Sequence, residues 1–141
     1  MEVTLRRDLD PDTDFYYREQ FKIYREPYLL WEKEIWEAIL STCDAYRIEV
    51  HGRYAGDVIL EERGKGTRYI TDFSLLPEYQ GRGVGKAALT EIEKMVRRLT
   101  AVTRKETLQF FVKSGFVLKR RLKNYYCYGV DGYYIEYNNL R

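Results

Sequence analysis

The apolar positions of the first 42 residues recur at helical spacing. A short strand is predicted over residues 3–6, and the Asp-rich residues 8–14 supply turn and N-cap chemistry. The apolar stripe that follows has spacings of four, three and four residues, at Tyr17, Phe21, Tyr24 and Tyr28. Pro27 interrupts this helix, and a second one follows with Trp31, Ile35 and Ile39 on one face. Two amphipathic helices are therefore expected after the first strand.

From residue 45 the period changes to two, which is typical of half-buried strands. Tyr46, Ile48 and Val50 alternate with polar residues, and a turn at residues 52–53 leads into a strand over residues 54–62. A second glycine turn opens a strand over residues 67–76 that Pro77 stops. The pattern predicts three successive antiparallel strands.

The remaining residues alternate again between helix and strand. Residues 80–85 open a third helix, whose apolar stripe is Ala88, Ile92, Met95 and Val96. A strand over 99–102, a helix over 107–113, and a closing hairpin of strands 116–122 and 133–137 follow. The order β-α-α-β-β-β-α-β-α-β-β predicts an α+β fold with a mixed sheet. Without a repeat or linker, residues 1–141 are expected to form a single domain.

Composition narrows the class of protein. The 141 residues are 45% hydrophobic and 33% charged, which fits one folded core. No apolar run approaches the ~18 residues of a membrane-spanning helix, and the start resembles no signal peptide. With two isolated cysteines and one histidine, neither a disulfide framework nor a zinc site is expected. We expect a cytoplasmic protein without a membrane partner or a metal.

Charge is balanced overall and uneven along the chain. The net charge is +2, too small to require a nucleic-acid partner. Residues 97–141 hold ten Lys and Arg against three Asp and Glu, which gives +7. This basic third suits a polyanion or a phosphorylated cofactor, and a solvated basic face is the alternative.

The most informative segment is the glycine-rich turn between the strand ending near Leu76 and the third helix. Glycines and a helix N-terminus turn backbone N–H groups toward a phosphate or pyrophosphate. A Walker A loop is excluded, since Gln80 replaces its first glycine and Ala87 follows Lys86. A dinucleotide fingerprint lacks the required hydrophobic parallel strand. The pattern Gln-x-x-Gly-x-Gly, formed by Gln80, Gly83 and Gly85, remains.

This pattern resembles a known family. Residues 80–85, preceded by a strand and residues 77–79, resemble the acyl-CoA-binding motif of the GNAT acetyltransferase superfamily. Residues 108–116 (LQFFVKSGF) resemble the family's second motif, an "FYxKxGF"-like helix end. Residues 123–126 (KNYY) with Asp131 resemble the closing hairpin of its protein N-terminal acetyltransferases. The resemblance covers about residues 43–138 and implies the GNAT fold, a mixed, mostly antiparallel sheet flanked by helices.

The resemblance implies acetyl-CoA as co-substrate, without a metal. The backbone of Phe73, Ser74 and Leu75 would pair with pantetheine like another strand, and the Leu75 N–H would stabilise the developing oxyanion. The remaining cofactor-binding residues would surround the pyrophosphate: Gln80, Gly81, Arg82, Gly83, Val84, Gly85 and Lys86.

Tyr69 aligns with the strand position at which many family members carry a Glu base or water-holder. An α-amine has a pKa of about 7.7–8, against about 10.4 for lysine, so it needs only weak help with deprotonation. A water held by Tyr69 would carry the proton away, which favours an α-amine acceptor. Carboxylates remain the alternative base: Glu49, Asp57, Glu61 and Asp72.

Other positions depart from the family pattern. Phe111 stands where a thiolate-protonating Tyr is frequent, so Tyr125 or Tyr126 is the candidate acid. Arg104 takes the place of an Asn that often contacts CoA. Tyr28, between the first two helices, would face Tyr126 and grip the first residue of a peptide acceptor.

The sequence thus predicts acetyl transfer from acetyl-CoA to a primary amine, by direct attack in a ternary complex. The preferred acceptor is a protein or peptide N-terminus. A small-molecule amine such as a polyamine or aminoglycoside, a lysine side chain, and a non-catalytic acyl-CoA-binding module are alternatives. A basic nucleic-acid-binding domain is a further alternative that we do not favour. An exposed edge beside the closing hairpin is compatible with a homodimer.

Overall fold

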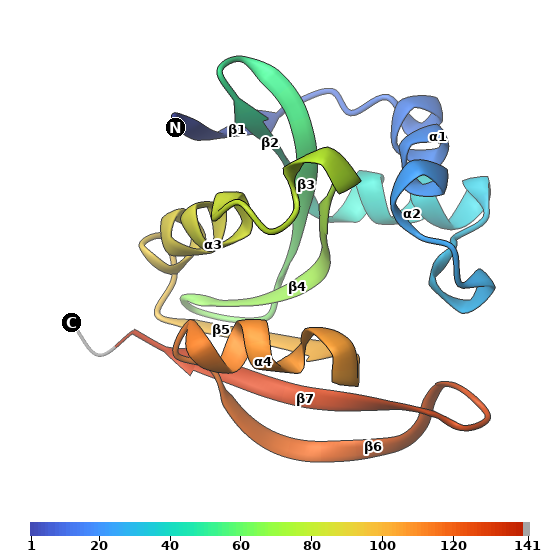
Figure 1. Cartoon of the computed structure of the whole chain (residues 1–141), viewed down its shortest axis with the longest axis vertical. Coiled ribbons are helices and arrows are strands. Elements are labelled where there is room, and N and C mark those ends of the chain that lie inside the picture. Colours follow the sequence, from blue (N-terminus) through green and yellow to red (C-terminus); the bar gives the residue numbers. More distant parts are fainter. Residues whose placement is uncertain (140–141) are drawn as a thin grey trace. The chain divides into compact units, whose positions relative to one another are not determined.

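A computed structural model of the protein describes residues 1–139 (Figure 1). The strands are β1 (Val3–Asp8), β2 (Asp44–Val50), β3 (Arg53–Glu62), β4 (Thr67–Leu75), β5 (Arg98–Thr103), β6 (Val117–Cys127) and β7 (Val130–Asn138). The helices are α1 (Thr13–Ile23), α2 (Lys33–Thr42), α3 (Val84–Glu93) and α4 (Lys105–Lys113), with the short 3₁₀ helices η1 (Pro27–Leu29) and η2 (Pro77–Tyr79). The strands hydrogen-bond in the order β1-β2-β3-β4-β5-β7-β6. The predicted α+β class and element order are confirmed.

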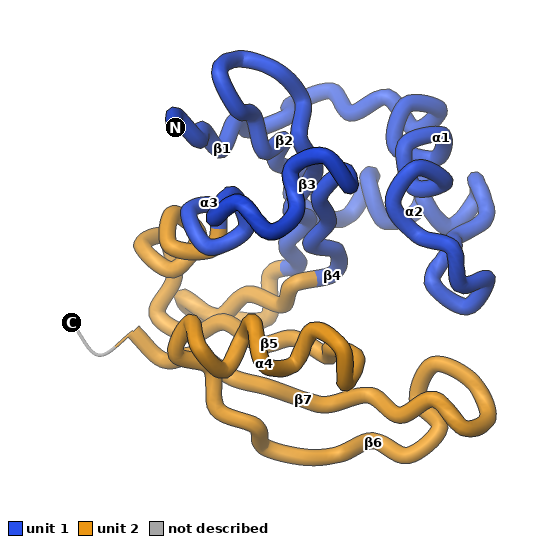
Figure 2. The backbone as a smooth tube through the Cα atoms, in the orientation of Figure 1, with its two compact units in different colours: residues 1–61, 71–88 blue, residues 62–70, 89–141 orange. Residues whose placement is uncertain are grey.

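The chain divides into two compact units, coloured separately in Figure 2. Unit 1 contains Met1–Glu61 and Thr71–Ala88, and unit 2 contains Glu62–Ile70 and the chain from Leu89 on. Strands β3 and β4 and helix α3 each contribute residues to both units. In unit 1, β1 pairs antiparallel with β2, and β2 with β3. In unit 2, β5 pairs in parallel with the start of β4 and antiparallel with β7, which pairs with β6.

The closing hairpin extends further than the sequence pattern indicated. Strand β6 reaches Cys127, because a bulge after Leu122 lets pairing with β7 resume at Val130. Strand β5, predicted over residues 99–102, occupies six residues. Most β6 side chains are exposed, as expected for a strand with a single neighbour.

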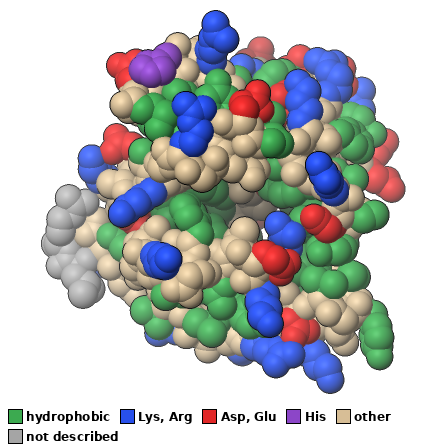
Figure 3. Space-filling model, in the orientation of Figure 1, with side chains coloured by type: hydrophobic (Ala, Val, Ile, Leu, Met, Phe, Trp, Pro, Cys, Tyr) green, Lys and Arg blue, Asp and Glu red, His purple; other side chains and the backbone are tan. Residues whose placement is uncertain are grey.

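The basic residues of the C-terminal third lie at the surface. Lys119, Arg120 and Arg121 on β6 are exposed, and Arg121 forms an ion pair with Asp131 of β7. On the face drawn in Figure 3, cationic and anionic side chains are interspersed among apolar ones. Among residues 1–139, no helix is long and apolar enough to cross a membrane.

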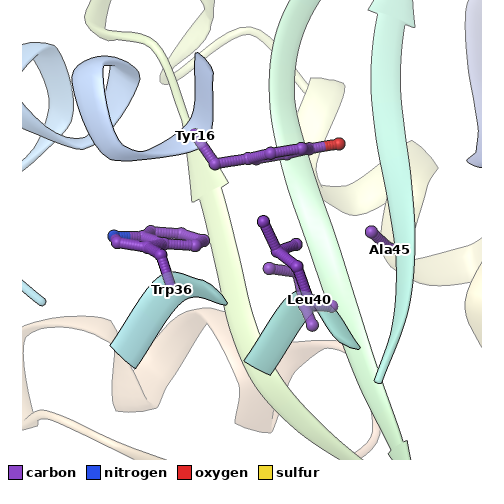
Figure 4. Close-up of a cluster of buried hydrophobic side chains, with 5 residues drawn as sticks. Tyr16, Trp36, Leu40 and Ala45 are labelled. Carbon is purple, nitrogen blue, oxygen red and sulfur yellow. The ribbon is translucent and has the colours of Figure 1, made fainter. Parts of the chain in front are cut away.

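The hydrophobic core of unit 1 joins α1 and α2 to the sheet. It contains Tyr16, Trp36, Leu40, Ala45 and Ile59. The rings of Tyr16 and Trp36 stack with 5.9 Å between their centroids, and Figure 4 shows them beside Leu40. Burial of such aromatic side chains contributes roughly 1.5–3 kcal/mol each.

The predicted helix faces were partly wrong. Phe21 and Ile35, both assigned to apolar stripes, are exposed, whereas Tyr16 and Trp36 are buried. The face of α1 is set by a polar residue, because buried Gln20 exchanges two hydrogen bonds with the backbone of Trp31, at 2.7 and 2.9 Å. Tyr24 caps the end of α1, and Tyr28 lies in η1, so the predicted stripe extended beyond the helix.

Unit 2 has a core of its own. Its fully buried side chains include Leu89, Ile92, Leu99 and Ile135. Phe111 packs edge-on against Phe116, with 5.3 Å between ring centroids. Met95, predicted for the apolar stripe of the third helix, lies beyond the end of α3 and is half exposed.

Glu93, in the last turn of α3, predicts how stability depends on pH. Burial raises its pKa to about 7, and its Oε2 has no hydrogen-bond partner among residues 1–139. In the unfolded chain this carboxyl has a pKa of about 4.3. Between that pH and about 7, the Glu93 carboxyl is therefore protonated in the folded state and ionised in the unfolded state. Ionising Glu93 lowers the free energy of unfolding progressively as pH rises from about 4.5 to 7.

We expect Glu93→Gln to be more stable than wild type by ~1 kcal/mol at pH 8, a value reduced for solvent screening at this half-buried site. The difference should vanish near pH 4, where both chains are neutral at this position. Urea denaturation at the two pH values measures it. An equal difference at both values would contradict a raised pKa at Glu93.

Candidate active site

The end of β4 presents backbone groups at an edge of the strand. The Leu76 N–H donates to the Ala55 carbonyl of β3, at 2.8 Å. Because backbone groups alternate along a strand, the N–H groups of Phe73 and Leu75 point away from β3. Parallel pairing with β5 covers only Thr67–Tyr69. Leu75 can therefore pair with an extended ligand, whereas the same alternation turns the Ser74 backbone toward β3 and the Phe73 backbone hydrogen-bonds to the Asp72 carboxyl group.

Two glycines shape the turn that follows. Gly81 and Gly83 have φ of 71° and 82°, in the region that favours glycine, and a Cβ at either position would meet no other atom. They are required for backbone conformation rather than for space. The turn leads into the first residues of α3, whose N–H groups lack partners within the helix and favour an anion.

Side chains of the turn hold its shape. Gln80 donates its amide Nε2–H to the Leu75 carbonyl, at 2.9 Å, and so ties the turn to the end of β4. Arg82 donates to the Glu78 carbonyl at 3.0 Å and lies over the Tyr79 ring. Val84 is fully buried and anchors the helix start, while Lys86 is exposed. The arrangement fits a diphosphate at the helix start and an extended amide chain along β4, the two parts of acetyl-CoA that the sequence predicts.

Unit 2 brings together three predicted tyrosines. Burial raises the pKa of Tyr69, and the hydroxyls of Tyr125 and Tyr126 raise it further, so the Tyr69 hydroxyl stays protonated at neutral pH. The Arg63 guanidinium lies over the Tyr69 ring, 4.3 Å from its centroid. Tyr126 donates its hydroxyl proton to the Val102 carbonyl at 3.2 Å. The cluster can hold a water or donate a proton.

A bulge in β6 places two of these rings. Asn124 has a φ of 56°, and its side chain accepts a hydrogen bond from the Gly129 N–H at 2.8 Å. Its own N–H donates to Asp131 Oδ1 at 2.9 Å. The bulge turns Tyr125 over Gly132, where a Cβ would lie 2.9 Å from the Tyr125 side chain. Within the predicted motif of residues 123–126 with Asp131, Asn124 and Asp131 therefore fix the conformation of the bulge.

Unit 1 buries two carboxyl groups beside each other. Asp57 of β3 is 3% exposed, and its neighbour Asp72 of β4 accepts a hydrogen bond from the Tyr24 hydroxyl at 3.0 Å. Burial, followed by the adjacent Asp72 carboxyl, raises the pKa of Asp57 well above its ordinary value, and burial also raises that of Asp72. The hydroxyls of Ser74 and Tyr54 face the same group. Two of the four carboxylates that the sequence left open as bases thus lie together.

The other candidate residues have structural or surface positions. Phe111 belongs to the core. Arg104 precedes α4, and its Nη1 lies 3.8 Å from Oε2 of Glu106. His51 is exposed in the β2–β3 turn. The pairing of Tyr28, in η1 of unit 1, with Tyr126 of unit 2 stays a prediction. No group of three or more His, Cys, Asp and Glu side chains within residues 1–139 is arranged to hold a metal ion.

The sequence reading missed the partners of the buried carboxyl groups. Tyr24 was assigned only to a helix stripe, and Tyr54 only to a strand. A signal was present, because Asp57 is the one charged residue in the otherwise apolar run of residues 54–60. A charge in a fully buried strand requires partners, which pointed to polar side chains on neighbouring elements.

Comparisons with known proteins agree with this geometry. The sequence model of the Acetyltransferase (GNAT) family matches residues 6–116. The solved ribosomal-protein-S18-alanine N-acetyltransferase from Escherichia coli is 16% identical with a TM-score of 0.82, over 97% of this chain and 94% of that one. A GNAT family acetyltransferase from Elizabethkingia anophelis, with acetyl-CoA bound, is 16% identical with a TM-score of 0.72, over 97% and 98% of the two chains.

A spermidine N-acetyltransferase chimera from Vibrio cholerae and hSSAT is 15% identical with a TM-score of 0.74, over 98% of this chain and 96% of that one. No curated protein matches the sequence. At such low identities the structural likenesses establish the fold, and the acceptors of these proteins differ from one another.

Proposed function

Because the chain belongs to the GNAT acetyltransferase family and is an acetyl-CoA-dependent N-acetyltransferase, we propose that its preferred acceptor is the α-amine of a protein or peptide N-terminus. The observation that carries this proposal is Tyr69, which replaces a strong base at its position of β4 and whose hydroxyl stays protonated. A neutral hydroxyl can hold a water but cannot retain a proton from lysine, whose pKa is about 10.4. An α-amine, with a pKa of about 7.7–8, is already partly neutral at pH 7.

Unit 1 supplies the binding groups for the co-substrate. The edge of β4 at Leu75 suits the amides of pantetheine, and the turn over residues 80–86 suits the pyrophosphate of the co-substrate. The Leu75 N–H would donate to the thioester oxygen as negative charge develops there. A preorganised donor of this kind contributes about 2.7–4 kcal/mol to lowering a barrier.

The reaction requires no covalent enzyme intermediate. The amine attacks the thioester carbon directly, and the sulfur leaves as a thiolate that needs a proton. Tyr125 is the proposed donor, because the Tyr126 hydroxyl already donates its proton to Val102. Tyr126 and Tyr28 would contact the first residue of the acceptor. We also propose that residues 1–141 act as one N-acetyltransferase domain, since three elements contribute to both units.

Two mixed peptide libraries, one with free and one with blocked N-termini, test the proposal when incubated with labelled acetyl-CoA. We expect mass spectrometry to locate label on α-amines of the free library only. Label on lysine side chains in both libraries would contradict the α-amine preference. Label on neither, with turnover on spermidine, would move the acceptor to small polyamines, and acetyl-CoA binding without any turnover would indicate a non-catalytic module.

A further inference from the structure

The buried carboxyl pair of unit 1 and two hydroxyl groups beside it contain polar atoms that lack hydrogen-bond partners within residues 1–139. Asp57 Oδ1, Asp72 Oδ2, Ser74 Oγ and Tyr54 Oη are all buried, and none has a well-formed hydrogen bond among residues 1–139. Buried polar atoms are normally paired, so several unpaired ones at one place require an explanation, and a catalytic role is one such explanation. Ser74 is 4% exposed, whereas Asp72 is half-buried.

The surroundings leave the pair with negative charge. From α1, Tyr16 and Glu19 act on the cluster, and both are uncharged or anionic. Arg47 lies opposite Asp57 in the pairing of β2 with β3, but its guanidinium forms an ion pair with Asp8 and lies 5.6 Å from the centroid of the Tyr54 ring. Two adjacent buried carboxyl groups hold one proton between them, because the charge of one opposes ionisation of the other.

The pair has a hydrogen-bonded route toward the surface. Tyr24 donates its hydroxyl proton to Asp72 Oδ1 and lies at the end of α1, where the chain turns toward η1. Its oxygen can accept a proton from an ammonium group while it passes its own proton to Asp72. Asp72 is three residues from Leu75, the proposed donor to the thioester oxygen.

We propose that the Asp57–Asp72 pair, which shares one proton, is the base of the reaction and takes up the proton of the acceptor's ammonium group through Tyr24. This inference rests on the proposed function and identifies the destination of a proton that Tyr69 cannot keep. The pair changes from one proton and one negative charge to two protons and no charge, and the ammonium becomes a neutral amine.

The later steps balance without another reactant. The nitrogen lone pair forms the C–N bond as the C–S bond breaks. Tyr125 gives its proton to the thiolate and regains one from the acylated nitrogen, which yields the amide and the free thiol. The pair then returns one proton to solvent.

Asp57→Asn tests the proposal, with Asp44→Asn as the matched control, because Asp44 of β2 pairs with Arg7 of β1 outside the cluster. We expect Asp57→Asn to fold at least as stably as wild type and to keep its KM for acetyl-CoA. Its kcat at pH 7 should fall about 100-fold, and less than about tenfold at pH 9, where the α-amine is already neutral. Asp44→Asn should keep the wild-type pH profile.

Further measurements keep the test decisive. If Asp57→Asn does not fold, Tyr24→Phe should show the same pH-dependent loss, since it removes only the hydroxyl in the route. The infrared spectrum is compared in a Glu93→Gln background, because Glu93 is also partly protonated at pH 7. In that background at pH 7 we expect a protonated carboxyl band that the further substitution Asp57→Asn removes. An unchanged kcat, an equal loss at both pH values, or the absence of this band would overturn the pair as base.

A failure of the proposed function can be distinguished from a failure of the carboxyl pair as base. If the wild type acetylates another amine but no α-amine, the comparison is made at one pH below and one pH above the pKa of that amine, and it still tests the pair. If the wild type acetylates no amine, both proposals are overturned.

Discussion

Replacing Gly56 with alanine is expected to unfold much of the protein at temperatures where the wild type is folded. A Cβ at Gly56 would lie 1.9 Å from the Ser74 carbonyl oxygen and 2.9 Å from the Leu75 Cα, which are backbone atoms of β4. Its φ is not in the left-handed region, so alanine would otherwise be favourable in this strand. The cost is therefore entirely steric, and relieving it requires β3 and β4 to separate.

We expect a loss of ~3 kcal/mol or more, at the upper end of what overpacking causes, because no side-chain rotation can relieve the clash. For a domain of this size, the Tm should fall by about 10 °C or more. Thermal denaturation followed by circular dichroism measures it.

Gly132→Ala is the matched control for this substitution. Gly132 also lies within a strand without a left-handed φ, but a Cβ there would meet side-chain atoms of Val102 and Tyr125 at 2.8–2.9 Å. Side chains can shift, so this variant should lose clearly less stability than Gly56→Ala. Equal Tm values for Gly56→Ala and wild type would mean that β3 does not approach β4 so closely, and that Asp57 is not held against Ser74.

The strands were predictable because the alternation of apolar and polar residues along a strand does not depend on how individual side chains pack. The meander of β2, β3 and β4 followed directly from the period of two and from the glycine turns. Helix faces were harder, because tyrosines suit either the core or the surface. In α1 the buried positions include Gln20, whose side chain binds the Trp31 backbone, and no hydrophobic pattern marks such a residue. A hydrogen bond between distant segments decided the face.

The candidate site was predictable where local sequence dictates it. Gly81 and Gly83 have φ in the left-handed region, so the glycine pattern reflects a backbone conformation that favours glycine. The cluster of Tyr69, Tyr125 and Tyr126 and the pair of Asp57 and Asp72 depend instead on contacts between elements far apart in the chain. Tyr24 and Asp72 are 48 residues apart, and their hydrogen bond joins the end of α1 to β4. The sequence could name Asp72 as a carboxylate of interest but could not name its partner.

Replacing Gly83 with valine is expected to weaken acetyl-CoA binding about ten- to a hundredfold. A valine held at a φ of 82° carries strain of roughly 1–3 kcal/mol, because its branched Cβ is crowded by its own backbone. The turn will instead populate conformations in which the N–H groups no longer converge on the start of α3. Because only the original conformation binds the pyrophosphate, the Kd rises as its population falls, tenfold for each 1.4 kcal/mol.

Gly52→Val separates this effect from general destabilisation. Gly52 has nearly the same φ, 79°, and equally open space around its Cβ position, but it lies in the β2–β3 turn. Both variants should lower the Tm by similar amounts, since the strain is the same. Only Gly83→Val should raise the Kd for acetyl-CoA, measured by isothermal titration calorimetry. Unchanged binding by Gly83→Val would show that the pyrophosphate does not depend on this turn, whereas weakened binding by both would trace the loss to stability rather than to the turn at the start of α3.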